Sequence, residues 1–429
     1  MNYHRDRFDD RFRDNNSSSY RNNNSYSGNN RRRHEQYDNN NMRKSGNDYR
    51  QRDYNHNHHN HHNTKNRNDR SRSRDNSSYN SSNSSDSYDD TVGHIDVQPG
   101  EIINNRYTVI KQLGIGTFGK VLQCNDSKHG DHVAIKVIRK IEKYVESAEI
   151  ESNILGTIYN QQKLKDRSTH LCVKLYSHFK SNGHYFMVFE TLGKSLFDII
   201  KENDYTGFNL NHTKHIAQQL LKAMDFLKSV NLIHTDLKLE NILLVNDKSQ
   251  RVWDSLKKRH IEIPIDTRIK VIDFGGATFD NEKHSSIINT RQYRGPEVTL
   301  EVGWSFPSDI WSVGCMIAEI YNGDLLFSTH ENLEHLCMME KCSGPFPQWM
   351  VEGKVAKQFF HSDGRLKNEK LSRHSLEDIR AMKTLSEIFT KEQGDRDSGI
   401  VDVMRKLLIL DPNKRITAND ALIHPFFQN

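Results

Sequence analysis

The first 90 residues of this 429-residue chain contain no leucine, isoleucine, valine, alanine, tryptophan or cysteine, and the first aliphatic residue other than methionine is Val92. They contain 21 asparagines, 15 serines and 15 arginines instead, with a net charge of +4 against +1 for the rest of the chain. Such a segment cannot bury enough apolar surface to offset the entropy lost when its backbone is ordered. We therefore expect a disordered Asn/Ser/Arg/His-rich tail over residues 1–100 and exclude a folded domain there.

Cysteine is scarce as well, with five scattered residues and no CxxC spacing: Cys124, Cys172, Cys315, Cys337 and Cys342. A disulfide framework or a structural zinc site is therefore not expected. No apolar run approaches the roughly 18 residues that span a bilayer, and the N-terminus lacks the apolar core of a secretory signal. We expect an intracellular, soluble protein without membrane contact. The histidine-rich run 56–62 is interpreted as low-complexity sequence rather than a metal site.

Apolar alternation begins at Tyr107 and predicts one helix over 144–158 among strands over 107–113, 121–125, 132–138, 172–179 and 185–190. After Gly193 the apolar period becomes helical, which predicts a helix over 212–230 and further helices from about 308 to the end. A short buried strand is expected at 269–272. The polar stretch 251–266 is interpreted as an irregular insertion. The pattern therefore predicts strands with one helix first and mostly helices afterwards.

A glycine-rich GxGxxGxV sequence lies between the first two predicted strands; it consists of Leu113, Gly114, Ile115, Gly116, Thr117, Phe118, Gly119, Lys120 and Val121. Glycines allow backbone amides to approach phosphate oxygens closely. A dinucleotide-binding fold would need a helix after the third glycine, whereas a strand is predicted here. Taken alone, the motif fits either a phosphate-binding loop or an ordinary glycine-rich hairpin.

Lys136 ends the apolar run Val133-Ala134-Ile135-Lys136, and a lysine on such a strand is costly unless its ammonium has partners. ATP phosphates and a carboxylate from the following helix would supply them. Glu151 is our candidate for that carboxylate, although Glu146 and Glu149 lie on the same predicted helix. The alternative is a lysine that reaches solvent from the strand edge.

The run Ile233-His234-Thr235-Asp236-Leu237-Lys238-Leu239-Glu240-Asn241 is far more specific. In it, Asp236 would orient a hydroxyl group or accept its proton, and Lys238 would neutralise charge on a moving phosphoryl group. Asn241 and Asp273, the latter in Ile272-Asp273-Phe274-Gly275, would hold Mg²⁺, which prefers a few hard oxygen ligands together with phosphate.

These motifs occur in the order typical of protein kinases and end with Gly295-Pro296-Glu297. From about 107 to 427 the sequence resembles a eukaryotic protein kinase domain. The resemblance implies an α+β, bilobal fold with a β-rich small lobe over about 107–191 and a mostly helical large lobe over about 192–427. It also implies ATP and Mg²⁺ as cofactors and a structural pair between Glu297 and Arg415.

Three longer runs resemble the LAMMER, or CDC-like, kinases: 234–238, 289–305 and 329–341. The third is similar to that group's EHLAMMER signature, with Cys337 and Lys341 as departures, and we expect it to form a helix that packs on the large lobe. The resemblance implies a monomeric, nuclear, dual-specificity kinase that autophosphorylates on Ser, Thr and Tyr. Its expected substrates are arginine/serine-rich splicing factors, which would make it a regulator of RNA splicing.

Three departures lie near the expected active site. Thr235 replaces the arginine that pairs with activation-loop phosphate in most kinases, so we hypothesise that activity does not require that phosphate. Leu239 and Gly295 replace proline and alanine, and Leu239 is expected to loosen the loop. Three alternatives stay open: a catalytically weak kinase-like scaffold, a related dual-specificity or CDK-type kinase, and RNA binding by the basic tail as the main role.

Overall fold

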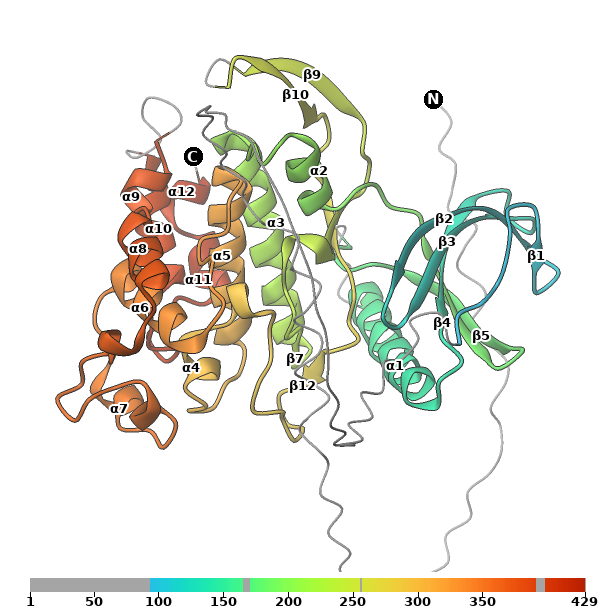
Figure 1. Cartoon of the computed structure of the whole chain (residues 1–429). Coiled ribbons are helices and arrows are strands. Elements are labelled where there is room, and N and C mark those ends of the chain that lie inside the picture. The colour runs from blue at the N-terminus through green and yellow to red at the C-terminus, as the bar shows by residue number, and fades with distance from the viewer. Residues whose placement is uncertain (1–92, 165–169, 255–256, 391–397, 429) are drawn as a thin grey trace, which may run out of the picture. The chain divides into compact units, whose positions relative to one another are not determined.

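The computed structural model describes residues 93–164, 170–254, 257–390 and 398–428. Its first part, the small lobe, is an antiparallel six-stranded sheet in the order β1-β2-β3-β4-β6-β5, against which helix α1 packs (Figure 1). The elements are β1 (Ile102–Ile103), β2 (Tyr107–Gly116), β3 (Gly119–Asp126), β4 (His132–Ile138), α1 (Glu142–Leu164), β5 (Leu175–Ser181) and β6 (His184–Glu190). The five predicted strands and the helix are confirmed; β4 has the predicted bounds, and β5 begins three residues later than expected.

Residues 93–100 fold onto the small lobe, so the predicted tail is wrong in this part. Ile95 and Val97 pack against the lobe's apolar core. The Lys120 Nζ donates to the Ile95 carbonyl at 2.9 Å, and the Lys140 amide donates to the Gly93 carbonyl at 2.7 Å. The alternation of apolar residues in this short segment gives it a partly buried face, and the composition of residues 1–90 offers no such face. The remaining tail, including the histidine-rich run 56–62, lies outside the described residues.

The large lobe is mostly helical, as predicted. The predicted helix over 212–230 is confirmed as α3, which begins where the Asn209 side chain accepts a hydrogen bond from the His212 amide at 2.9 Å. The helices are α2 (Leu196–Glu202), α3 (Leu210–Ser229), α4 (Pro296–Thr299), α5 (Pro307–Asn322), α6 (Asn332–Ser343), α7 (Gln348–Val351), α8 (Arg373–Ala381), α9 (Leu385–Ile388), α10 (Ile400–Leu407), α11 (Ala418–Leu422) and α12 (Pro425–Gln428), with 3-10 turns η3 (Leu239–Asn241), η4 (Arg291–Tyr293), η5 (Ala356–Gln358) and η6 (Asn368–Lys370).

Three two-stranded sheets complete the large lobe. Two of them carry the loops of interest: β7 (Leu232–Ile233) pairs with β12 (Thr278–Phe279), and β8 (Ile242–Leu244) pairs with β11 (Ile269–Val271). Because all these pairs are antiparallel, the segments 234–241 and 272–277 emerge from neighbouring strands and lie close together. The fold therefore brings the two most specific sequence motifs to one place.

The polar insertion is not irregular but forms the hairpin β9 (Ser249–Asp254) and β10 (Arg259–Pro264), and that prediction is wrong (Figure 1). Asn203, at the end of α2, fixes the hairpin with both ends of its side-chain amide. Its Nδ2 donates to the Glu262 carbonyl at 2.7 Å, and its Oδ1 accepts from the Glu262 amide at 2.9 Å. The stabilising contact thus comes from a residue far away in the sequence, which a local polarity pattern does not reveal.

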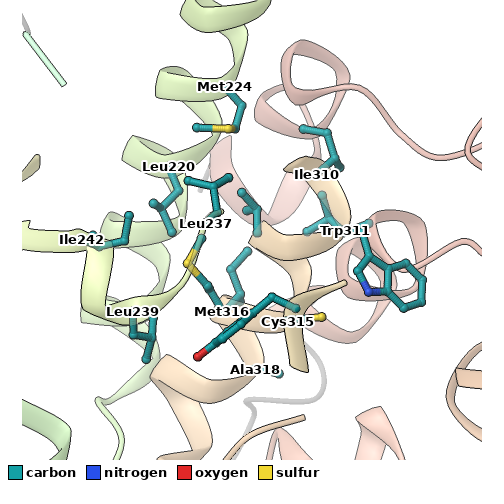
Figure 2. Packing of buried hydrophobic residues seen from close by; sticks show 14 of the residues in the cluster. Leu220, Met224, Leu237, Leu239, Ile242, Ile310, Trp311, Cys315, Met316 and Ala318 are labelled. Atoms are coloured by element: carbon teal, nitrogen blue, oxygen red, sulfur yellow. The ribbon is translucent and has the colours of Figure 1, made fainter. Parts of the chain in front are cut away.

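A compact apolar core lies directly beneath the segment 234–241. Figure 2 shows Leu237, Leu239 and Ile242 packed with Leu220 of α3 and Met316 of α5. Leu239 is 0% exposed. The prediction that this leucine loosens the loop is therefore contradicted, because its side chain is buried in the core and anchors the loop there.

Candidate active site

Lys136, Glu151 and Asp273 meet where the small lobe faces the large one. Lys136 lies on β4, opposite Val121 on β3 and Met187 on β6. Its Nζ is 2.8 Å from the Glu151 Oε2 and 3.5 Å from the Asp273 Oδ1. The structure thus selects Glu151 among the three candidate carboxylates of α1.

The electrostatics of this triad favour the charged forms of Lys136 and Asp273, whereas burial raises the pKa of Glu151 despite the attraction of the Lys136 ammonium. Burial opposes the charge on Lys136, but the carboxylates of Glu151 and Asp273 outweigh it and raise the lysine's pKa. The ammonium of Lys136 in turn lowers the pKa of Asp273, against the effect of burial. Asp273 therefore presents a carboxylate charge, which is the ligand type that a divalent cation prefers.

The glycine-rich segment forms the turn between β2 and β3, where Gly114 pairs with Val121 and Gly116 with Gly119. Gly119 is required by packing, because a Cβ there would lie 2.0 Å from the Val137 carbonyl oxygen. At Gly114 and Gly116, in contrast, a Cβ would meet nothing within 4 Å. The protein's own packing therefore does not explain these two glycines, and close approach by a phosphate chain would.

The side chains of the other residues in the glycine-rich segment are mostly exposed to solvent. Leu113, Ile115 and Phe118 are exposed large apolar side chains, and Thr117 is exposed at the turn. The Thr117 carbonyl accepts a hydrogen bond from the Arg139 guanidinium at 3.2 Å. Lys120 is the exception among the predicted nucleotide-binding residues, since its ammonium is committed to the Ile95 carbonyl.

Asp309, a buried carboxylate on α5, fixes the start of the segment 234–241. It accepts hydrogen bonds from the amides of His234 at 2.8 Å and Thr235 at 3.1 Å. Thr235 has a φ of 69°, which is a strained left-handed conformation for a β-branched residue. Its hydroxyl donates to the Gly276 carbonyl at 2.7 Å. The hydrogen bonds made by the Thr235 amide and by its hydroxyl therefore offset the strain of this conformation.

Asp236 accepts hydrogen bonds from two directions. Its Oδ1 accepts from the Thr290 hydroxyl at 2.7 Å and from the Thr290 amide at 3.0 Å. Its Oδ2 accepts from the Lys238 Nζ at 2.8 Å, and that ammonium also reaches the Thr290 hydroxyl at 3.2 Å. Burial opposes the charge on Lys238, but attraction to Asp236 outweighs it and raises the pKa of Lys238. A carboxylate and an ammonium are thus held side by side.

Asn241 lies on η3, next to Asp236. Its Nδ2 donates to the Asp236 carbonyl at 2.9 Å, which directs the amide oxygen the other way. Among the described residues there is no group of three or more His, Cys, Asp or Glu side chains arranged to hold a metal ion. The donor set that remains for Mg²⁺ is an amide oxygen, a carboxylate and the phosphates of a nucleotide, which fits the usual chemistry of this ion.

Two residues of this site were missed from the sequence, namely Thr290 and Asp309. Thr290 lies in the run 289–305, which was noted only for its family resemblance, and Asp309 lies in the region predicted only to be helical. Their contacts with Asp236, His234 and Thr235 span about 50 to 75 positions. The expected structural pair is confirmed: Arg415 forms two hydrogen bonds with the Glu297 carboxylate, at 2.7 and 3.0 Å, and both side chains are fully buried.

The comparisons with known proteins agree with this geometry. A family model described as protein kinase domain matches residues 107–427. Dual specificity protein kinase lkh1 of Schizosaccharomyces pombe is 41% identical over 345 residues, covering 80% of this chain and 49% of lkh1. Dual specificity protein kinase CLK2 of Mus musculus is 43% identical over 343 residues, covering 79% of this chain and 67% of CLK2.

More distant relatives and a solved structure extend the match. Serine/threonine-protein kinase AFC3 of Arabidopsis thaliana is 40% identical over 351 residues, covering 80% of this chain and 86% of AFC3. A crystal structure of the PF14_0431 kinase domain superposes with a TM-score of 0.70 at 36% identity, covering 78% of this chain and 99% of that one. The fold is that of a protein kinase.

The chain belongs to the protein kinase family, and within it to the LAMMER, or CDC-like, group of dual-specificity kinases. The predicted resemblance and the α+β bilobal fold are thereby confirmed. The chain spans about half the length of lkh1 and two thirds of CLK2. In the part of the chain that the structure describes, no helix is long and apolar enough to cross a membrane.

Proposed function

We propose that this chain is an ATP- and Mg²⁺-dependent protein kinase that phosphorylates serine and threonine on other proteins and autophosphorylates on tyrosine as well. The observation that carries the proposal is the arrangement of Asp236, Lys238 and Thr290, joined by hydrogen bonds of 2.7 to 3.2 Å. It keeps an anionic oxygen and an ammonium close together at a half-buried position. This pair suits a reaction in which a hydroxyl loses a proton while negative charge moves.

The residues around this pair have complementary roles in the proposal. When bound, ATP supplies the transferable phosphoryl group, and Mg²⁺ offsets the negative charge of the phosphates. The backbone from Leu113 to Val121 and the Lys136 ammonium would bind the phosphates, and Glu151 would orient Lys136. Asn241 and Asp273 would hold the metal ion. The open space at Gly114 and Gly116 supports this assignment.

Asp236 would act on the protein substrate. Its carboxylate would accept a hydrogen bond from the substrate hydroxyl and orient the oxygen for in-line attack. It would receive the proton as the new oxygen–phosphorus bond forms and the bond between the γ-phosphorus of ATP and its bridging oxygen breaks, which releases ADP. Lys238 would offset the negative charge that develops on the moving group. No covalent intermediate on the enzyme is required, and the rate gain comes from positioning and electrostatics.

The finer parts of the proposal rest on family membership. We propose a kinase domain over 107–427 with lobes that divide near 191, a monomeric state, a nuclear location and arginine/serine-rich splicing factors as substrates. The relatives CLK2 and lkh1 are named dual specificity protein kinases, which supports action on Ser, Thr and Tyr. The net charge of +4 over residues 1–90 supports a role for the tail in docking, localisation or weak RNA contact.

A radiolabelled phosphate-transfer assay tests the proposal. The full chain would be incubated with Mg²⁺–ATP and either an arginine/serine-repeat peptide or a neutral serine peptide, with Asp236→Asn as the control. Strong transfer to the repeat peptide that is lost in Asp236→Asn supports both activity and substrate class. Transfer to the neutral peptide alone keeps the kinase and removes the substrate class. Tight ATP binding without transfer to either peptide contradicts the proposal and favours a kinase-like scaffold.

A further inference from the structure

The LAMMER-like run has no role in the mechanism described so far. It forms α6, and Leu336, Met338 and Met339 are buried in the large-lobe core, which confirms the expected packing role. Its N-terminal polar residues are not explained by that packing. Glu334 and His335 are 3% and 1% exposed, and such polar burial is costly unless the groups meet specific partners.

Glu334 closes the turn that precedes α6. Its Oε2 accepts hydrogen bonds from the Thr329 hydroxyl at 2.8 Å and from the His330 amide at 2.9 Å. Burial alone would raise the pKa of this carboxyl, but these donors outweigh it and lower the pKa. Glu334 is therefore a buried carboxylate that holds residues 329 and 330 in place.

The turn and the first residue of α6 contact η4 directly. The Arg291 guanidinium donates to the Asn332 Oδ1, and the Gln292 Nε2 donates to the Thr329 carbonyl at 3.4 Å. Arg291 and Gln292 immediately follow Thr290 in the chain. A continuous series of contacts therefore runs from α6, through residues 291 and 292, to the hydroxyl that binds Asp236.

The far side of η4 has its own supports. The Tyr293 hydroxyl donates to the Glu319 carboxylate on α5, and the Tyr293 carbonyl accepts from the Ser312 hydroxyl at 2.8 Å. Because these contacts do not involve α6, loss of the α6 contacts would loosen residues 290–292 without unfolding the segment. The two supports can thus be separated by mutation.

We propose that Asn332 and Glu334 are positioning residues that hold the segment 290–294 in the geometry that presents a protein substrate to Asp236. This proposal rests on the proposed kinase function. It gives the N-terminal half of the LAMMER-like run a role in substrate use, whereas the C-terminal half serves packing. The consequence is that changes at Asn332 should affect the use of peptide more than the use of ATP.

The test compares variants at the two ends of α6. Asn332→Ala removes the acceptor for Arg291, and Asn332→Asp restores it. Lys341→Ala is the matched control, because Lys341 donates to the carbonyls of Ile379 and Arg380 at the opposite end of the helix. Each protein would be assayed for the KM of peptide, the KM of ATP and the thermal midpoint of unfolding.

We expect Asn332→Ala to raise the KM of peptide by about tenfold, the lower end of the range for loss of a hydrogen bond to a charged group. The KM of ATP and the unfolding midpoint should stay unchanged, and Asn332→Asp should restore the KM of peptide. Lys341→Ala should not change it. An unchanged KM of peptide in Asn332→Ala, or an equal rise in Lys341→Ala, would overturn the proposal.

Amide hydrogen exchange gives a reading that does not depend on catalysis. The Tyr293 and Arg294 amides donate to the Thr290 and Arg291 carbonyls within η4. Their exchange should become about tenfold faster in Asn332→Ala and in Glu334→Gln, and stay unchanged in Lys341→Ala. Unchanged exchange in both variants would refute the positioning role, whether or not the unaltered chain transfers phosphate. Absence of phosphate transfer by the unaltered chain would contradict only the proposed kinase function.

Discussion

Removal of the Thr290 hydroxyl is the sharpest test of the arrangement around Asp236. Thr290→Val keeps the shape of the side chain and the amide that donates to the Asp236 Oδ1 at 3.0 Å, but it removes the 2.7 Å donor. A hydrogen bond to a charged group contributes about 1.5–3 kcal/mol. If that energy serves to orient Asp236 in the transition state, kcat should fall by about 10- to 150-fold.

The assay is steady-state phosphate transfer at saturating Mg²⁺–ATP, with Thr290→Ser as the matched control. Serine retains the hydroxyl, so its kcat should stay within about threefold of the unaltered chain. The unfolding midpoint of both variants should be close to the original, because Tyr293 and its partners on α5 still hold the segment. If Thr290→Val retained its kcat, Thr290 would not orient Asp236, and the catalytic arrangement proposed above would be wrong.

Three further outcomes are expected. Glu297→Gln should lower the free energy of unfolding by about 3–5 kcal/mol, measured by urea denaturation, because it leaves the Arg415 guanidinium buried without a charged partner. Phosphatase-treated enzyme should keep most of its turnover, because Thr235 cannot pair with an activation-loop phosphate; a large loss would refute this. Burial, with the charges of Arg294 and Arg291, lowers the pKa of His335 to about 3. The unfolded chain then binds the extra proton below about pH 6.5, and the free energy of unfolding should fall by about 1.4 kcal/mol for each pH unit towards pH 4, a contribution that His335→Phe should remove.

Much of the small lobe could be predicted from the sequence because its strands alternate strongly between buried and exposed residues. In β4, for example, Val133, Ile135 and Val137 are buried while the residues between them are less so. A period of two is a local property, and it fixes both the element and the face that it buries. The candidate lysine could be noticed because Lys136 places a charge at the end of the otherwise apolar run that begins at Val133.

The features that were missed depend on partners far away in the chain. The hairpin of β9 and β10 is fixed by Asn203, and the end of the predicted tail by contacts with Lys120 and Lys140. Asp309 is equally hidden, because an acid in an apolar helix gives no sign that it will accept two amides from residues 234 and 235. Local pattern cannot reveal such contacts, since each depends on how the chain folds back on itself.

Thr235 and Leu239, two of the departures near the expected active site, both lie at anchored positions of the catalytic loop. Thr235 adopts a left-handed backbone that costs of the order of 1–3 kcal/mol. Three hydrogen bonds hold this backbone. The amides of His234 and Thr235 donate to the Asp309 carboxylate, and the Thr235 hydroxyl donates to the Gly276 carbonyl. Leu239 fixes the other end of the loop by burial in the core. Asp236 is thus held between two anchored ends, and neither departure removes a group that the proposed reaction needs.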